Sequence, residues 1–313
     1  MSLKKNIIWS DVDWNRVSPE LRDATLAQYE FVHGEDNLLK ANIAFGKPDP
    51  ALLKDAAHLQ WIHLSSAGHA QYDGDDLNVL FKQRGIMMTN SSAVYAEPCA
   101  EHLFAMILGL ARRLPQAMKN QLDAKDWNQL EQRENAYLLT NQKVLLLGYG
   151  AIARRLAELL QPFDMQISAL RQHPNQERNV TIISQKDLPK VLSEADHIVN
   201  ILPENESTKK FVDEEFLTGA KADASFYNIG RGTTVDQNAL MAALKKGNLA
   251  AAYLDVTSPE PLPPNHPLWT TPNCYITPHS GGGHRDEFDR LLRHFLGNLK
   301  KFENGEELSD RVI

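Results

Sequence analysis

Three segments in the second half of the chain each place an ionisable residue just after a short apolar run that predicts a strand. Arg231 lies in "YNIGRGTTVD", Glu260 in "AAYLDVTSPEP" and His279 in "CYITPHSGG". An arginine can bind a carboxylate and polarise a neighbouring carbonyl group, and a histidine held by a carboxylate can donate a proton near neutral pH. These residue types together suit the reduction of a carbonyl group by a hydride donor.

A glycine-rich turn farther up the chain predicts the hydride donor. The segment "VLLLGYGAIA" carries Gly148, Gly150 and Ala153 in the spacing G-x-G-x-x-A, between a predicted strand and an amphipathic helix. Gly148 permits a tight turn, Gly150 lets the backbone approach a pyrophosphate, and Ala153 is small enough for helix–strand packing. The amides of Ala151 and Ile152 open the helix and would face the phosphates. We expect a bound dinucleotide; the alternative is a glycine-rich turn in another doubly wound protein.

The residue that follows the second strand of this region bears on the choice of cofactor. An acid about 20 residues beyond the turn would bind the ribose 2′-hydroxyl of NAD. Arg171 stands there instead. Glu158 lies on the preceding helix and Asp164 lies before the strand, so neither acid takes this position. Because an arginine forms charge-assisted bonds with a 2′-phosphate, Arg171 favours NADP over NAD. The alternative is a solvated arginine, with NAD held by backbone contacts.

Other reactive side chains fit structural positions better. Cys99 and His102 share a helix face at a spacing that ordinary packing also produces, and no third residue orients them, so we do not expect a nucleophilic pair. With two cysteines in 313 residues, neither a disulfide framework nor a cysteine-rich zinc site is expected, and no metal is predicted. Tyr95, just before the long helix, is a candidate for the substrate pocket.

The elements that position these residues alternate between strands and helices. In the first hundred residues we expect strands at 6–9, 42–46, 60–65 and 85–90 and helices at 18–28 and 49–57. A second series has strands at 143–148, 165–170, 197–202, 225–230, 251–256 and 274–278. This alternation predicts parallel sheets covered by helices on both faces, the second sheet being doubly wound. A long helix over 96–122, broken near Pro115, connects the two regions, and 286–308 predicts one amphipathic helix.

Bulk properties narrow the class of protein. The net charge of −7 argues against a broad surface for nucleic acid or for an anionic membrane, since both require a basic excess. No apolar run approaches the ~20 residues that span a bilayer. The N-terminus "MSLKKNIIWS" has no long apolar run after its lysines, so no signal peptide is expected and a cytoplasmic enzyme is predicted.

Taken together, "GYGAIARRLA", "NIGRGTTVD", "LDVTSPEPLP" and "ITPHSGG" resemble the D-isomer-specific 2-hydroxyacid dehydrogenase family, and in particular its glyoxylate/hydroxypyruvate reductases. The similarity extends to 65–73, 89–108 and 197–213. The resemblance implies an α/β protein with a Rossmann nucleotide domain, residues 99–284, inserted in a smaller flavodoxin-like substrate domain, residues 1–98 and 285–313. It also implies a homodimer, as is usual in the family.

The resemblance implies roles for the residues at the strand ends. Arg231 matches the family's substrate-binding arginine, Glu260 its histidine-orienting acid and His279 its general acid/base. Asp255 matches the aspartate near the nicotinamide carboxamide.

Further positions match the family's binding segments. The backbone amides of Ala67 and Gly68 match the loop that holds the substrate carboxylate. Leu202 and Pro203 resemble the wall near the adenine, and Thr208 a residue on the cofactor side.

Three features depart from the family pattern: Arg171 replaces the usual acid, Thr257 and Ser258 replace an aromatic segment, and "HSGGGHRDE" is unusually rich in glycine. The expected function is the NAD(P)H-dependent reduction of a small 2-oxoacid such as glyoxylate or hydroxypyruvate. Two alternatives stay open: a dinucleotide-sensing regulator or corepressor on the same fold, and an enzyme that oxidises a hydroxyacid with NAD.

Overall fold

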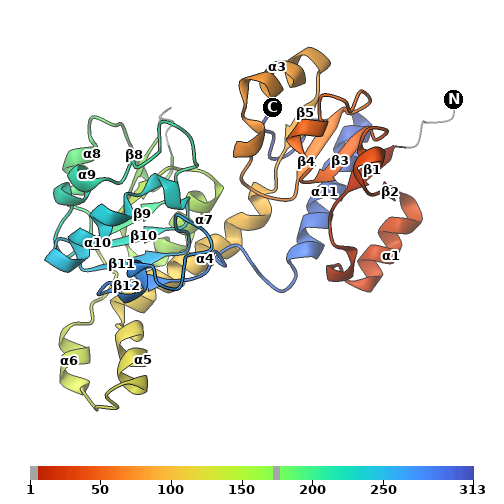
Figure 1. The fold of residues 1–313 in the computed structure, drawn as a ribbon. Coiled ribbons are helices and arrows are strands. Elements are labelled where there is room, and N and C mark those ends of the chain that lie inside the picture. The colour runs from red at the N-terminus through yellow and green to blue at the C-terminus, as the bar shows by residue number, and fades with distance from the viewer. Residues whose placement is uncertain (1–5, 172–176) are drawn as a thin grey trace. The chain divides into compact units, whose positions relative to one another are not determined.

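The computed structural model describes residues 6–171 and 177–313, which divide into two compact units (Figure 1). The first unit is Met1–Tyr95 with Gly283–Ile313, and the second is Ala96–Gly282. The sequence predicts domain boundaries after residues 98 and 284. The substrate and nucleotide roles that it assigns to the two domains stay predictions.

The first unit is built on a parallel sheet of five strands. These are β1 (Ile7–Ser10), β2 (Glu30–Val32), β3 (Ile43–Gly46), β4 (Trp61–Leu64) and β5 (Met87–Thr89). Their order across the sheet, β2-β1-β3-β4-β5, is that of flavodoxin-like folds, as predicted. β3 and β4 are buried along their whole length, because helices cover both faces of the sheet.

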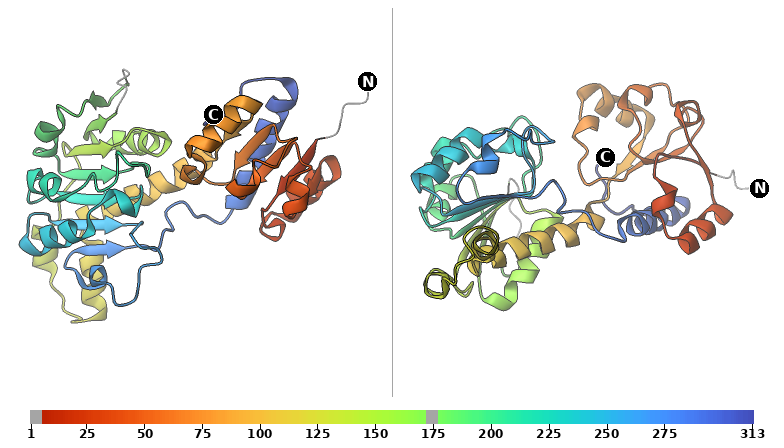
Figure 2. Two further views of the ribbon diagram at one scale, coloured as in Figure 1. Left: turned by 45° about the horizontal axis from the view of Figure 1, so that its top comes forward. Right: turned by 60° about the horizontal axis from the view of Figure 1, so that its bottom comes forward.

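Two separate apolar cores occupy the two faces of this sheet. The helices are α1 (Pro19–Gln28), α2 (Glu35–Leu38), α3 (Asp75–Arg84) and α11 (Glu287–Asn304). Figure 2 shows α3 on one face and α1 with α11 on the other. Phe295 of α11 stacks on Phe45 of β3, with ring centroids 4.3 Å apart. The last helix of the chain therefore completes the core of the first unit.

The predicted helix over 49–57 is wrong. The structure has only a 3-10 turn at Pro50–Leu52, capped by the side chain of Asp49, which accepts a hydrogen bond from the amide of Ala51. Leu53 and Ala56 are fully buried. A nine-residue segment is too short to be stable as a helix by itself, so the burial of these two side chains decides its conformation.

The second unit contains a parallel sheet of seven strands. These are β6 (Lys143–Leu147), β7 (Gln166–Leu170), β8 (Thr181–Ile183), β9 (His197–Asn200), β10 (Ser225–Asn228), β11 (Ala251–Leu254) and β12 (Cys274–Ile276). Their order is β12-β11-β10-β9-β6-β7-β8. Counted from β6, the sheet grows first to one side and then to the other. This is the predicted doubly wound arrangement, in which ligands bind at the carboxyl ends of the strands.

The helices of the second unit include the long helix and a helical hairpin. They are α4 (Ser92–Ala111), which begins in the first unit, α5 (Leu114–Leu122), α6 (Gln129–Glu134), α7 (Ala151–Leu160), α8 (Leu188–Leu192), α9 (Glu214–Gly219) and α10 (Gln237–Lys246). The predicted break near Pro115 is confirmed. It lies at Arg113, whose φ of 56° ends α4, and Pro115 falls in the first turn of α5, where its missing N–H costs nothing.

The described residues contain neither a candidate membrane-spanning helix nor a candidate metal-binding cluster. None of the helices in 6–171 and 177–313 is long and apolar enough to cross a membrane. In the same residues no group of three or more His, Cys, Asp or Glu side chains could hold a metal ion.

Candidate functional site

The turn between β6 and α7 has the features that a pyrophosphate requires. Gly148 has a φ of +95°, so the backbone itself demands glycine there. Gly150 differs: its φ is −95°, and a Cβ placed on it would meet nothing within 4 Å. Nothing in the described chain therefore requires glycine at 150, but a ligand that approaches the backbone would. Ala153 is fully buried in α7, which explains why this position must be small.

The same turn leaves the start of α7 open. The N-cap residue of α7 is Gly150, which has no side chain to cap the amides of the first helical turn, including those of Ala151 and Ile152. Leu202 lies beside the turn, with its Cδ2 3.8 Å from the position that a Cβ of Gly148 would take. The residues present thus fit a dinucleotide phosphate at the N-terminus of α7.

Arg171, directly after β7, forms an ion pair with a nearby acid. Its Nη1 donates to Oε1 of Glu177 at 3.3 Å, and Arg154 Nη2 lies 3.7 Å from the same oxygen. An acid, Glu177, therefore contacts Arg171 although it lies six residues farther along the chain. Gln172 and His173, which follow Arg171 in sequence, lie outside the described residues. No spacing rule would have found Glu177.

The segment after β9 is held by its own side chains. The hydroxyl of Thr208 donates to the carbonyl oxygen of Pro203 at 2.6 Å, and Thr208 is largely buried. Leu202 is also buried, and its carbonyl oxygen lies 2.6 Å from where a Cβ of Gly230 would stand. Thr208 therefore stabilises this segment in the structure, because its hydroxyl donates its proton to the backbone of the segment.

The two glycines that flank Arg231 lie against the backbone of neighbouring strand ends. A Cβ at Gly232 would lie 2.0 Å from the carbonyl carbon of Thr257, and one at Gly230 would meet Leu202. Both glycines thus allow three strand ends to pack backbone against backbone. Arg231 is partly buried, and its Nη1 donates to the carbonyl oxygen of Gly230 at 2.7 Å.

His279 and Glu260 lie in contact with each other. Nδ1 of His279 lies 2.7 Å from Oε2 of Glu260, and the other carboxylate oxygen accepts the amide of Thr257 at 2.9 Å. With Nδ1 facing the carboxylate, Nε2 is the ring nitrogen left to meet a substrate. A pocket of about 460 Å³ borders the pair, and Trp269 and Ile276 are among its lining residues, a size that suits a small ligand.

Asp255 fixes the backbone that carries His279. Its Oδ1 accepts the hydroxyl of Thr277 at 2.6 Å and the amide of Ser280 at 2.9 Å, and its Oδ2 accepts the amide of Gly281 at 2.9 Å. The amide of His279 donates to the carbonyl oxygen of Asp255 at 2.8 Å. These bonds hold His279 at a φ of +50°, a conformation that residues other than glycine seldom adopt.

His102, which the sequence assigns only a structural place, belongs to this arrangement. Its Nε2 lies 3.1 Å from the hydroxyl of Thr277 and 3.5 Å from Oδ1 of Asp255. A Cβ at Gly281 would lie 2.8 Å from Oδ2 of Asp255 and 3.0 Å from Cδ2 of His102. Glycine is thus required at position 281. Burial raises the pKa of the neighbouring Cys99 thiol to about 12, which makes it a poor nucleophile.

Asp255 gives this arrangement a pH dependence. Burial would raise the pKa of Asp255, but hydrogen bonds from His102, Thr277 and the amides of Gly281 and Ser280 outweigh it and lower the pKa to about 2. A carboxyl whose folded pKa lies below its unfolded value of about 3.9 stabilises the fold above that pH and loses the contribution as the pH falls.

We expect Asp255→Asn to lower the free energy of unfolding at pH 7 by on the order of 2–3 kcal/mol, as an Asp pKa of about 2 implies. The difference from the wild type should shrink as the pH falls from about 5 to about 2. Urea unfolding across this range measures it, with the exposed Asp223→Asn as control. A difference that does not vary with pH would contradict this account.

In the first unit, the loop that follows β4 has all its carbonyl groups engaged. The four carbonyls of residues 65–68 accept, in order, from Tyr95 Oη at 2.9 Å, Ser91 N at 3.0 Å, Asn90 Nδ2 at 2.8 Å and Ser66 Oγ at 2.8 Å. Among the described residues, no hydrogen-bond acceptor is found for the amides of Ala67 and Gly68. A loop with its carbonyls tied back and its amides unengaged is suited to bind an anion.

Comparisons with known proteins agree with this geometry. Residues 104–281 match the model of the NAD-binding domain of D-isomer specific 2-hydroxyacid dehydrogenases. The human glyoxylate reductase/hydroxypyruvate reductase is 35% identical over 260 residues, which cover 82% of this chain and 77% of that protein. The glyoxylate/hydroxypyruvate reductase B of Escherichia fergusonii is 33% identical over 267 residues, covering 82% and 81%.

A solved structure shares the fold over nearly the whole length. It is a D-isomer specific 2-hydroxyacid dehydrogenase family protein from Aeromonas salmonicida subsp. salmonicida, 25% identical, with a TM-score of 0.77 and 99% of each chain covered. The NAD-binding domain makes the chain an NAD(P)-dependent dehydrogenase. The chain belongs to the D-isomer specific 2-hydroxyacid dehydrogenase family.

Proposed function

We propose that this protein reduces a small 2-oxoacid, of the glyoxylate or hydroxypyruvate type, to the D-2-hydroxyacid with NAD(P)H. The observation that carries the proposal is the 2.7 Å contact between His279 Nδ1 and Glu260 Oε2, on the same sheet edge as Arg231. The strands β10, β11 and β12 that precede these residues are adjacent in the sheet. In this proposal the second unit holds the dinucleotide and the first unit contributes to binding of the substrate.

Each of these side chains has a role in the proposed reaction. The guanidinium of Arg231 binds the carboxylate of the substrate and polarises its carbonyl oxygen. Nε2 of His279 donates a proton to that oxygen, and Glu260 orients the ring and stabilises its protonated form. The nicotinamide, when bound, supplies a hydride to the carbonyl carbon. The amides of Ala67 and Gly68 are further proposed ligands of the substrate carboxylate.

The proposed cofactor contacts follow from the turn and from two neighbouring strand ends. The amides of Ala151 and Ile152 face the pyrophosphate, Leu202 and Pro203 line the adenine side, and Thr208 holds this segment in place. Asp255 lies near the nicotinamide carboxamide. Among the described residues its Oδ2 accepts one hydrogen bond, from the amide of Gly281, so it has capacity for a second donor.

For the choice of cofactor we propose NADP, with Glu177 as the residue that limits the preference. Arg171 would bind the 2′-phosphate, but Glu177 occupies its guanidinium in the structure. Since a hydrogen bond to a charged group is worth about 1.5–3 kcal/mol, we expect Arg171→Asp to lower the NADPH:NADH ratio of kcat/KM by ~10–100-fold. Glu177→Gln should raise the same ratio, because it frees Arg171.

Steady-state kinetics with both cofactors measure these ratios, and Arg22→Asp, at a partly exposed arginine of α1, is the control. An unchanged ratio in Arg171→Asp would show that Arg171 does not contact the cofactor. A lowered ratio in Glu177→Gln would exclude the competition between Glu177 and the 2′-phosphate.

The proposed activity is tested by a screen of glyoxylate, hydroxypyruvate and pyruvate with NADPH and with NADH. We expect oxidation of the cofactor with at least one of the first two acids. Tight cofactor binding without turnover of any acid would favour a dinucleotide-sensing regulator. Turnover only of the hydroxyacids with NAD would favour the oxidative direction. The proposed compartment is the cytoplasm, where Cys99 and Cys274, both free thiols, would stay reduced.

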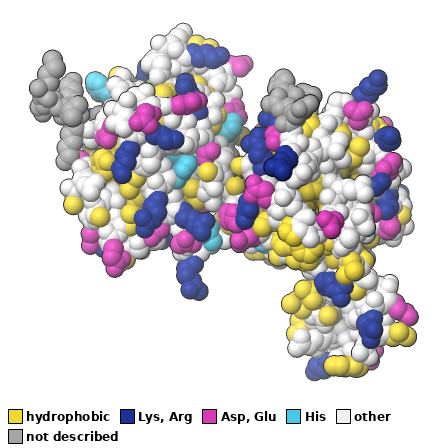
Figure 3. Space-filling view, turned by 180° about the vertical axis from the view of Figure 1, so that it is seen from behind, with side chains coloured by type: hydrophobic (Ala, Val, Ile, Leu, Met, Phe, Trp, Pro, Cys, Tyr) yellow, Lys and Arg dark blue, Asp and Glu magenta, His cyan; other side chains and the backbone are white. Residues whose placement is uncertain are grey.

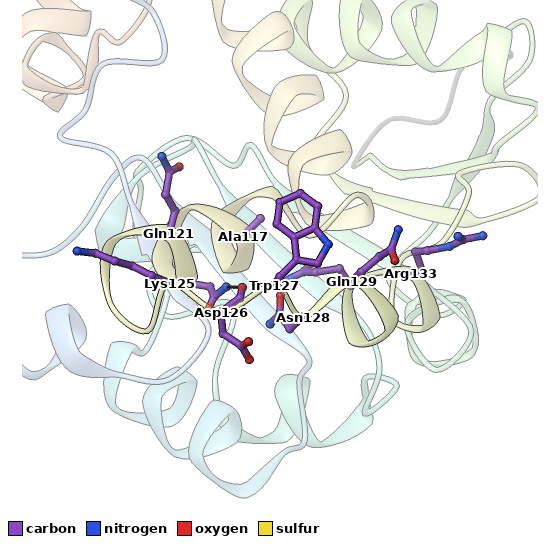
Figure 4. A pocket seen from close by; sticks show the side chains of 10 residues that line it. Ala117, Gln121, Lys125, Asp126, Trp127, Asn128, Gln129 and Arg133 are labelled. Carbon is purple, nitrogen blue, oxygen red and sulfur yellow. Dashed lines mark hydrogen bonds between the residues drawn. The ribbon is translucent and has the colours of Figure 1, made fainter.

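We propose further that two copies pair through the hairpin of α5 and α6. Met118, Leu122 and Trp127 have exposed fractions of 63%, 78% and 90%, unusually high for apolar side chains that stand close together. Figure 3 shows apolar side chains gathered on this hairpin and on the adjoining surface of its unit. In Figure 4 the Trp127 ring stands between side chains of α5, such as Gln121, and of α6, such as Gln129.

Light scattering should therefore give a mass of about twice 35.2 kDa. A variant with Leu122→Lys and Trp127→Lys should be a monomer, because two charges would be buried in an apolar contact. Leu26→Lys, at an exposed leucine of α1, is the control. A wild-type monomer, or a double variant that stays dimeric, would contradict the proposed interface.

A further inference from the structure

The first carbonyl of the loop that follows β4 depends on one side chain. Tyr95 lies in the first turn of α4, and its hydroxyl donates to the carbonyl oxygen of Ser65 at 2.9 Å. Ser65 begins the loop whose unengaged amides belong to Ala67 and Gly68. Ser65 N donates to the carbonyl of Gly46 at 3.3 Å, so both backbone polar groups of Ser65 are fixed.

A carboxylate competes for the same hydroxyl. Oε1 of Glu287, the first residue of α11, also lies 2.9 Å from Oη of Tyr95. A tyrosine hydroxyl has one proton and donates to one acceptor at a time. When Glu287 is ionised, it therefore competes with the carbonyl of Ser65 for the single proton of Tyr95. The charged acceptor is the stronger of the two.

We propose that Tyr95 is a positioning residue for the substrate carboxylate and that Glu287 limits its effect. The bond to Ser65 holds the start of the loop, and this orients the amides of Ala67 and Gly68 toward one anion. Tyr95 acts through the loop and does not have to touch the substrate. This inference rests on the proposed binding of a 2-oxoacid by those two amides.

The orientation of two amides affects substrate binding more than the chemical step. The loss of one hydrogen bond that orders a binding loop corresponds to about a fivefold to tenfold change in affinity. We therefore expect Tyr95→Phe to raise the KM for the 2-oxoacid by about that factor. Its kcat and its KM for NAD(P)H should stay within about twofold of the wild type.

Tyr72→Phe is a matched control in the same unit. The hydroxyl of Tyr72 donates to the carbonyl of Pro48 at 2.9 Å, so both variants lose one tyrosine–carbonyl hydrogen bond. Thermal unfolding of the two variants should show comparable losses of stability. Only Tyr95→Phe should raise the KM for the 2-oxoacid. An equal rise of KM in Tyr72→Phe would show that the effect is a general loss of stability and would overturn the inference.

Glu287→Ala tests the competition directly. Without the carboxylate of Glu287, the carbonyl of Ser65 has one competitor fewer for the proton of Tyr95, so the KM for the 2-oxoacid should fall or stay unchanged. In Tyr95→Phe the further change Glu287→Ala should have no effect on KM. A rise of KM in Glu287→Ala, or an unchanged KM in Tyr95→Phe, would overturn the proposal.

The affinity for oxamate, a non-reacting analogue of a 2-oxoacid, gives a second readout that does not need turnover. Its dissociation constant in the presence of NADPH should rise by the same factor in Tyr95→Phe, measured by calorimetry. If the wild type reduces no 2-oxoacid, the proposed function fails. If the wild type is active and Tyr95→Phe binds oxamate as the wild type does, only this inference fails.

Discussion

Replacing His279 by alanine should lower kcat for a 2-oxoacid by ~10²–10⁴-fold, the range that a general acid contributes. The dissociation constant of NAD(P)H should stay nearly unchanged. The reason is that Nε2 of His279 is the proposed proton donor, while the described cofactor turn at Gly148–Gly150 does not include this ring. Stopped-flow reduction under saturating substrate measures the rate, and fluorescence titration measures cofactor binding.

Two variants test whether this loss is specific. His58→Ala removes an exposed histidine of the first unit and should leave kcat unchanged. Glu260→Gln keeps the shape of the partner but removes its charge, and it should cause a smaller loss than His279→Ala because the ring is still present. A His279→Ala enzyme with wild-type kcat would rule out His279 as the proton donor.

Arg231→Lys should lower kcat/KM for the 2-oxoacid by ~10²–10⁴-fold, because a lysine cannot replace the two charge-assisted bonds of a guanidinium, each worth about 1.5–3 kcal/mol. Both KM and kcat should change: KM should rise because the carboxylate is bound less well, and kcat should fall because the carbonyl is less polarised. Steady-state kinetics over a wide range of substrate concentration separate the two effects.

Arg22→Lys provides the control for the same substitution at a partly exposed site of α1. Circular dichroism and thermal unfolding should show that Arg231→Lys is folded, since the bond that Nη1 of Arg231 donates within the described residues is a local one, to the carbonyl of Gly230. A kcat/KM within threefold of the wild type would mean that Arg231 does not hold the substrate.

Much of the fold could be predicted because its strands are apolar runs buried on both faces. The strands over 143–147 and 225–228 are examples, since each lies in the middle of a sheet. The strands β2 and β8 were missed because they have three residues each and lie at sheet edges, so partial exposure weakens their apolar pattern. The prediction of a helix over 49–57 failed because burial of its side chains in the tertiary structure outweighed the local helical pattern.

The residues of the candidate site could be predicted from the sequence, but the side chains that contact them could not. Arg231, Glu260 and His279 follow strands that end at one edge of a parallel sheet, and the sequence shows that order directly. The partners depend on contacts between residues apart in the sequence: Glu177 contacts Arg171 from six residues farther along the chain, and His102 contacts Asp255 from a helix more than 150 residues earlier in the chain. Such contacts leave no local pattern in the sequence.

The most direct test of the central claim is the transfer of deuterium from NAD(P)H labelled at C4 of the nicotinamide to hydroxypyruvate. The proposed mechanism predicts one deuterium at C2 of the product, which should be D-glycerate by chiral chromatography and mass spectrometry. A product without deuterium at C2, or the L-enantiomer, would contradict hydride transfer by a D-2-hydroxyacid dehydrogenase.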